Sequence, residues 1–201
     1  MRDKMDILRE VGNTAAAHGS TALSEILGRK ILLRLPIVDV LPCDGKSNKI
    51  ALSGMVFTMQ SHLLSGLQGR IVFLLDEQSA YKLIDMCYKL EQIKSNIGPF
   101  TEMGLSVIKE IGNIIISSYV NSLGLFLKRL IIPSFPILIN APLPEIINAI
   151  NPEYNPENSL LMVQAIFEEE KDKIQGNFWL ILSPETAQEI ENICKGLLNS
   201  I

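Results

Sequence analysis

A carboxylate and a carboxamide recur three residues apart at two places in the chain: Glu10 with Asn13, and Glu110 with Asn113. On a helix, residues at i and i+3 are neighbours, so each pair would present its two side chains together. An amide cannot exchange a proton near neutral pH, but its hydrogen bonds can hold a water molecule in line with a reactive phosphoryl or acyl centre. A glutamate could accept a proton or pair with a cation on a partner.

The sequence offers no other group that would complete an active site. No Ser-His-Asp or Cys-His set accompanies the pairs, and Gly12 and Gly19 do not form a phosphate-binding loop. The histidines and cysteines are widely spaced, so we expect no metal site, and we expect Cys43, Cys87 and Cys194 to be reduced thiols. The pattern suits an enzyme whose partner brings the rest of the catalytic apparatus.

For a single helix, the simpler interpretation is that a glutamate and an asparagine only face solvent. The residues beside each pair, and their recurrence, favour a functional role instead. Glycine and asparagine are poor helix formers, glycine costing about 1 kcal/mol against alanine, yet both occur side by side at residues 12–13 and 112–113. A surface without a task would more readily carry lysine, glutamine or alanine there.

The chain is predicted to be one domain built of two repeats, about 1–98 and 99–201. Glu10, Gly12 and Asn13 recur after 100 residues, whereas Gly69 recurs after 107 as Gly176. The seven extra residues must lie between Pro136 and Gly176, an interval that contains a charged run at 168–173, expected to be a solvated loop. Such a duplication favours a pseudo-twofold arrangement.

Each repeat is predicted to run helix, extended segment ending in proline, strand, strand, helix. Apolar periodicity and turn residues place these elements at 3–27, 30–36, 50–59, 70–75 and 79–91, and at 101–127, 128–136, 160–168, 177–182 and 184–198. In the first helix of each repeat, the Glu-Asn pair falls opposite the apolar stripe. The positions Asp6 and Ser106, four residues before each glutamate, extend the same polar stripe.

Composition excludes several classes. Of the 201 residues, 47% are hydrophobic, so bulk disorder is excluded, and a net charge of −4 argues against a broad nucleic-acid surface. The charged N-terminus indicates no signal peptide. The longest apolar stretch, 130–143, contains three prolines and cannot cross a membrane as a helix; it is expected to be a buried strand and loop. A cytoplasmic location is expected.

The motif Asp or Ser, three residues, Glu, two residues, Asn, twenty-two residues, Pro resembles the signature of the CheC-type chemotaxis phosphatases, the CheC/CheX/FliY family. The chain matches it twice, with Asp6, Glu10, Asn13 and Pro36 and with Ser106, Glu110, Asn113 and Pro136. Two copies are most similar to the CheC branch. The resemblance implies an α/β (α+β) fold: a pseudo-twofold repeat with a continuous mixed or antiparallel sheet and two motif helices exposed on one face.

The resemblance also implies a function. The substrate would be the aspartyl phosphate of the response regulator CheY, which would supply Mg²⁺ and a lysine, so that the chain needs no cofactor of its own. Asn13 and Asn113 would orient water, and Glu10 and Glu110 would pair with that lysine. Asp6 and Ser106 would be supporting residues, Pro36 and Pro136 structural ones. The deamidase CheD is the second expected partner; no nucleic acid and no membrane insertion are expected.

Two alternatives remain open at this point. The same helices could bind phosphorylated CheY, or the second half could bind CheD, without useful turnover, which would make the chain a non-catalytic adaptor. The chain could also be an interaction module at the flagellar switch. Hydrolysis of CheY phosphate is the preferred hypothesis because of the duplicated Glu-Asn pairs.

Overall fold

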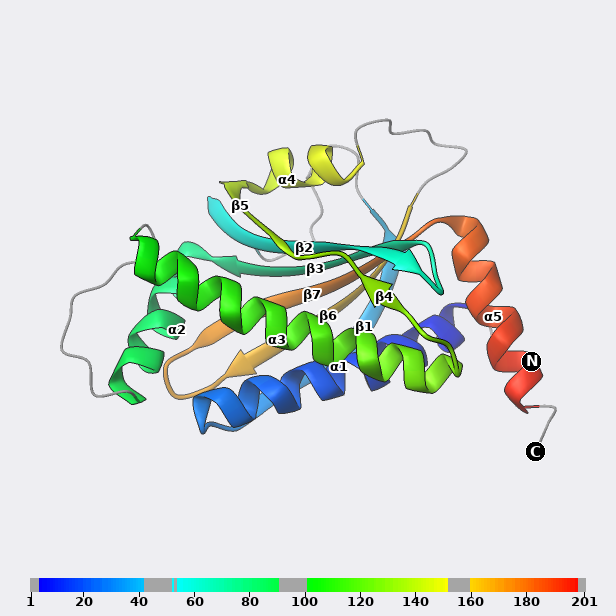
Figure 1. Ribbon diagram of the computed structural model, residues 1–201, viewed down its shortest axis with the longest axis horizontal. Coiled ribbons are helices and arrows are strands. Elements are labelled where there is room, and N and C mark those ends of the chain that lie inside the picture. The colour runs from blue at the N-terminus through cyan, green and yellow to red at the C-terminus, as the bar shows by residue number, and fades with distance from the viewer. Residues whose placement is uncertain (1–3, 42–51, 53, 91–100, 152–159, 199–201) are drawn as a thin grey trace.

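The computed structural model describes residues 4–41, 52, 54–90, 101–151 and 160–198. These residues form a seven-stranded sheet of order β1-β6-β7-β3-β2-β4, with β5 also pairing with β2, and every printed pair is antiparallel. The predicted α/β class and the continuous sheet are confirmed (Figure 1). The elements are α1 (Lys4–Leu27), β1 (Ile31–Val40), β2 (Met55–Ser65), β3 (Gly69–Asp76), α2 (Glu77–Leu90), α3 (Glu102–Leu127), β4 (Ile132–Pro133), β5 (Ile137–Pro142), α4 (Leu143–Ile150), β6 (Leu161–Glu169), β7 (Ile174–Leu182) and α5 (Pro184–Leu198).

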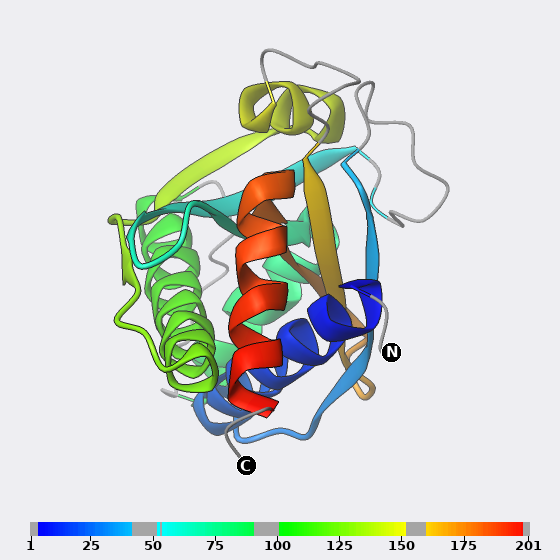
Figure 2. The same ribbon diagram turned by 90° about the vertical axis from the view of Figure 1, so that its right-hand side faces the viewer.

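The sheet separates two hydrophobic cores. The larger core joins one face of the sheet to α1, α2, α3 and α5, and its aromatic centre includes Phe73, Phe167 and Phe178 with ring centroids 5.3–5.5 Å apart. The smaller core joins the other face to α4, through Ile146, Ile147 and Trp179 among others. Figure 2 shows α4 on the opposite side of the sheet from the other helices.

The two long helices begin and end as the sequence predicts, within a residue. The Thr101 hydroxyl accepts a hydrogen bond of 3.0 Å from the Gly104 N–H, which caps the N-terminus of α3. Both helices end in a left-handed residue, Gly28 (φ 57°) and Lys128 (φ 52°). The next N–H in each case donates back into the last turn, from Arg29 to the Ser24 carbonyl (3.2 Å) and from Arg129 to that of Gly124 (2.9 Å).

The first-half strands differ from the prediction. The segment 30–36 does not end at Pro36; β1 runs on to Val40, and Pro36 lies inside it at a register shift between Arg34 and Ile37. This is possible because β1 is an edge strand, where a missing N–H costs least. The strand predicted at 50–59 is β2, shifted to Met55–Ser65, and residues 50, 51 and 53 lie outside the described residues. Cys43 and Glu91 lie outside them as well.

The second half differs more. The predicted extended segment 128–136 is a strand only at β4, and β5 begins after Pro136. The stretch 130–143 is therefore not one buried strand, and the helix α4 was not predicted. The charged run at 168–173 is shorter as a loop than expected, because β6 continues to Glu169, whose carboxylate accepts a 2.7 Å hydrogen bond from the Asp172 N–H.

Both halves share an order of elements. In each half, a long helix is followed by an edge strand, two paired strands and a shorter helix. The first half has the order α1-β1-β2-β3-α2, and the second has α3-β5-β6-β7-α5, with β4 inserted before β5 and α4 after it. The two-repeat organisation, about 1–98 and 99–201, stays a prediction, which this order supports.

Candidate functional site

The two motif helices pack against each other in opposite directions. The Ser122 hydroxyl donates to the Thr14 carbonyl over 3.3 Å, while five residues further along α1 Gly19 lies close to Ile115. Asn13 therefore lies across from the region of Ser122, nine residues from Asn113. At 1.5 Å per residue, the two asparagines are separated by roughly 13 Å along the helix axes. The motif copies are two separate sites.

The first copy lies on the polar side of α1. Asp6 and Glu10 are exposed and Asn13 is half-buried. Asp6 is engaged by its own helix, because Arg9 Nη1 lies 2.9 Å from Asp6 Oδ1. Within the part of the chain that the structure describes, no side-chain hydrogen bond or ion pair holds Glu10 or Asn13. Arg9 was missed in the sequence, although its i+3 spacing from Asp6 signals the pair.

The second copy, on α3, is more open. Ser106, Glu110 and Asn113 are all exposed, and Lys109 stands where the first copy has Arg9. Among the described residues these four side chains make no ion pair or side-chain hydrogen bond. The two copies thus share a free Glu-Asn pair and differ in the charge arrangement next to it.

The glycine beside each asparagine has a packing role. A Cβ added to Gly12 would lie 2.4 Å from Val163 Cγ1 on β6, and one added to Gly112 would lie 2.6 Å from Met59 Cγ on β2. Each glycine therefore brings its helix close to the sheet. This packing explains the two glycines without a functional role. It does not explain the asparagines, of which Asn113 is exposed and Asn13 half-buried.

The two motif prolines occupy different positions. Pro36 is buried, and its Cβ lies 3.8 Å from the position a Gly12 Cβ would take, so it packs beneath the first motif copy. Pro136 is half-buried and directly precedes β5. Neither proline has a reactive group, and a structural role stays the prediction for both.

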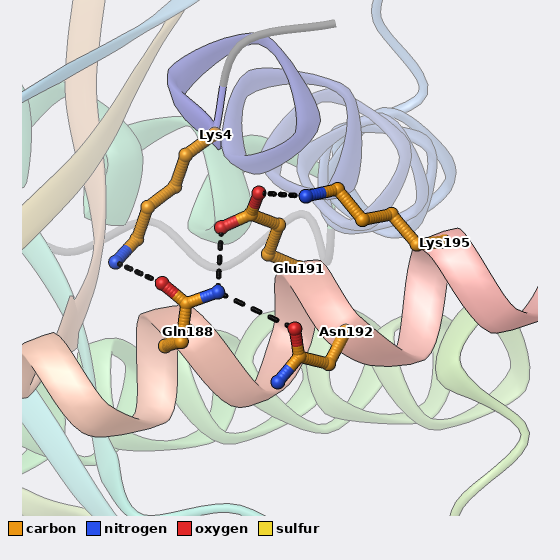
Figure 3. A network of polar contacts seen from close by, with 5 residues as sticks. All are labelled: Lys4, Gln188, Glu191, Asn192 and Lys195. Atoms are coloured by element: carbon orange, nitrogen blue, oxygen red, sulfur yellow. Dashed lines mark hydrogen bonds and ion pairs between the residues drawn. The ribbon is translucent and has the colours of Figure 1, made fainter. Parts of the chain in front are cut away.

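A polar network fixes the first turn of α1 against α5 (Figure 3). Lys4 Nζ donates to Gln188 Oε1 over 3.3 Å, and Gln188 Nε2 donates to Glu191 Oε2 over 2.8 Å and to Asn192 Oδ1 over 3.3 Å. Lys195 forms an ion pair with Glu191, which lowers the pKa of that carboxyl. The network holds the end of α1 that carries Asp6 and Glu10.

No group of three or more His, Cys, Asp or Glu side chains among the described residues could hold a metal ion. No described helix is long and apolar enough to cross a membrane.

Comparison with known proteins confirms the resemblance to the CheC-type family. A model described as the CheC-like family matches residues 103–139, which include the second motif copy. The CheY-P phosphatase CheC of Bacillus subtilis (strain 168) is 29% identical over 140 residues. That match covers 67% of this chain and 65% of the relative, slightly less than two thirds of its length.

Solved structures share the fold. FliY of Thermotoga maritima matches with a TM-score of 0.70 and 22% identity, covering 96% of each chain. The middle domain of FliM from Vibrio alginolyticus matches with a TM-score of 0.60 and 11% identity over 93% of this chain and 99% of that one. CheX of Desulfovibrio desulfuricans matches with a TM-score of 0.57 and 14% identity, covering 85% and 99%. The fold is therefore common to chemotaxis and flagellar proteins.

Proposed function

We propose that this protein hydrolyses the aspartyl phosphate of the response regulator CheY, with one site on each motif helix. The observation that carries the proposal is that both Glu-Asn pairs project from the helices without internal partners among the described residues. Side chains that stabilise nothing within their own molecule are available to a partner. The similarity to a CheY-P phosphatase supports the choice of substrate.

The two side chains of each pair have different roles in this proposal. Asn13 or Asn113 orients the water that attacks phosphorus, because an amide can donate and accept hydrogen bonds at once. Glu10 or Glu110 pairs with a lysine of CheY and so fixes the register of the complex. Asp6 and Ser106 support these pairs.

The chemistry needs little more from this chain. An acyl phosphate is already reactive, so positioning of water accounts for most of the acceleration. Mg²⁺ is held by CheY, and the chain brings no cofactor of its own. The absence of a nucleophile or histidine base in the motif follows from this division of labour.

The test is the rate at which phosphorylated CheY loses phosphate. Wild type is expected to accelerate the loss, and Asn13→Ala with Asn113→Ala is expected to reduce the acceleration about 100-fold or more. Asn121→Ala removes an exposed asparagine of α3 outside the motif and is the matched control, expected to keep wild-type activity. Full activity in the double variant would refute the assignment.

The single variants rank the two sites. Asn113 is exposed and Asn13 half-buried, so the second site needs less rearrangement to reach a partner. Asn113→Ala is therefore expected to lose more activity than Asn13→Ala.

A non-catalytic adaptor is the second candidate function. The observation that favours it is a line of exposed apolar side chains near β4 and β5, where Phe135 is 93% and Leu130 79% exposed. The FliM-type structures of the same fold also include a FliG–FliM complex from H. pylori, at 12% identity and a TM-score of 0.63 over 93% of this chain and 98% of that one. Binding of phosphorylated CheY without faster phosphate loss would support the adaptor.

CheD is proposed as a further partner. Co-elution of purified CheD with this chain, and a change in phosphatase rate on its addition, would test the pairing. If neither effect is seen at micromolar concentrations of both proteins, CheD is removed from the proposal.

A further inference from the structure

A basic pocket lies at the opposite end of α1 from the network of Figure 3. Its volume is about 440 Å³, and its lining comprises Arg29, Lys82, Asp85, Met86, Lys89, Lys171 and Asp172. Figure 1 shows its three sources, the C-terminal end of α1, helix α2 and the β6–β7 turn, at the same end of the molecule. A cluster of cations is unexpected in a chain whose net charge is −4.

The charges of the pocket do not cancel. Four cationic side chains face two carboxylates, and one of these, Asp85, is already paired with Lys89 on the same helix. Arg29 and Lys171 have no hydrogen bond or ion pair from their side chains among the described residues. Among the described residues, Lys82 Nζ donates one hydrogen bond, to the Lys173 carbonyl over a long 3.5 Å. Asp85 and, more weakly, Asp172 raise the pKa of Lys89, so both carboxylates of the lining already interact with that one lysine.

At the equivalent position in the other half of the chain, the arginine is neutralised by an ion pair. Arg129 follows α3 as Arg29 follows α1, and Glu189 is the sixth residue of α5 as Lys82 is the sixth of α2. Arg129 forms an ion pair with Glu189 and donates to the Gly66 carbonyl over 3.2 Å. Where that half has an arginine neutralised by a glutamate, the pocket has an arginine and a lysine. Cations that outnumber the nearby carboxylates repel each other, so an anion is the partner that would balance them.

We propose that this pocket binds a compact phosphate-type polyanion. The lining has a net charge of +2, from four cations and two carboxylates, which matches a group carrying two or more negative charges. The planar guanidinium of Arg29 can bind two phosphate oxygens at once, and the lysines supply point charges. The pocket lies within the size range of small-molecule sites, and no aromatic side chain in its lining would stack on a base.

The test uses pyrophosphate as the probe and isothermal titration calorimetry on the full chain. Wild type is expected to bind one pyrophosphate, with affinity that falls as salt rises. Lys82→Glu, which recreates the Arg129–Glu189 pairing, is expected to weaken binding at least tenfold and to leave the melting temperature without anion equal or higher. Lys109→Glu makes the same change of charge on exposed α3, away from the pocket, and is expected to bind like wild type.

Three results would overturn the proposal. The first is no saturable binding by wild type at about 10 mM pyrophosphate, a concentration that already allows for very weak affinity. The second is equal loss in Lys82→Glu and Lys109→Glu, which would indicate only a general charge effect. The third is binding of an acidic peptide, such as oligoglutamate, without pyrophosphate binding, which would identify a protein-docking surface instead. Because binding is measured without CheY, the result does not depend on phosphatase activity.

Discussion

Val72 and Trp179 face each other as direct cross-strand partners on β3 and β7, at the middle of the sheet. They are 179 − 72 = 107 residues apart, the offset that also separates Gly69 from Gly176. The same row continues outward to a glutamine and then an isoleucine on each side, namely Gln60 and Ile137 beyond Val72, and Gln164 and Ile37 beyond Trp179. This near-symmetric row supports the proposed pseudo-twofold repeat, with its axis between Val72 and Trp179.

Substitution of the motif glycine tests the close approach of α1 to the sheet. Gly12→Ala is expected to lower the free energy of unfolding by about 1–3 kcal/mol, because its Cβ would lie 2.4 Å from Val163 Cγ1. That cost outweighs the ~1 kcal/mol by which alanine favours a helix over glycine. Urea unfolding of Gly196→Ala, a helical glycine with open space around its Cβ, gives the control, which is expected to be stabilised.

The same clash predicts coupling between two distant positions. In a chain that already carries Val163→Ala, Gly12→Ala is expected to cost less than in wild type, because the opposing methyl groups are gone. A double-mutant cycle by urea unfolding measures this coupling. Simple additivity would show that Gly12 is needed for another reason.

The left-handed residue that ends α3 is a site for stabilisation. Lys128 adopts φ 52°, a conformation that glycine takes without a Cβ penalty and that Gly28 fills at the end of α1. Lys128→Gly is expected to raise the free energy of unfolding by about 0.5–1 kcal/mol, which stabilises the fold. The converse change, Gly28→Ala, is expected to destabilise, and thermal unfolding of both variants checks the pair.

The network of Figure 3 predicts a pH-dependent contribution to stability. The hydrogen bond from Lys195 lowers the pKa of Glu191 in the folded chain, so the ionised carboxylate stabilises the fold at neutral pH. That contribution is present above the unfolded pKa and is lost as pH falls through the lowered folded pKa. Glu191→Gln is therefore expected to be less stable than wild type at pH 7, with the difference shrinking below about pH 4. Urea midpoints across this range measure it; a constant difference would contradict the prediction.

The motif glutamates are expected to act through a charge pair. Glu10→Gln with Glu110→Gln should reduce kcat/KM for phosphorylated CheY about 10- to 100-fold, the typical loss of a charge-assisted hydrogen bond. Activity of the variant should also depend less on salt than that of wild type, because an intermolecular ion pair has been removed. Glu102→Gln, an exposed carboxylate in the first turn of α3, is the matched control. An unchanged salt dependence would argue against the pairing with lysine.

The long helices and the positions of the motif side chains on them were predictable because their signals are local. Periodicity and end residues placed α1, α3 and α5 within a residue, and the spacing of Glu10 and Asn13 placed both away from the core. The helix α4 was missed because its two prolines, Pro142 at the cap and Pro144 in the first turn, suggested a loop. Proline in fact fits a helix start, where its missing N–H has no partner to lose.

What depends on distant residues could not be predicted. Gly12 is needed because Val163, 151 residues further along the chain, leaves no room for a Cβ there, and no local pattern contains that contact. The course of β1 through Pro36 depends on its place at the sheet edge, which only the assembled sheet defines. The basic pocket likewise joins residues from three separate elements.

The close contacts of the two motif glycines are made between the halves. Gly12 on α1 packs against β6 of the second half, and Gly112 on α3 packs against β2 of the first. During synthesis, α1 leaves the ribosome long before β6 exists. At about 5–20 residues per second, the 151 residues between Gly12 and Val163 take roughly 8–30 s to make. Until then the apolar face of α1, which includes Ile7, Leu8 and Val11, can pack against β1 but not against β6. The newly made chain is therefore expected to be most exposed to aggregation before β6 emerges.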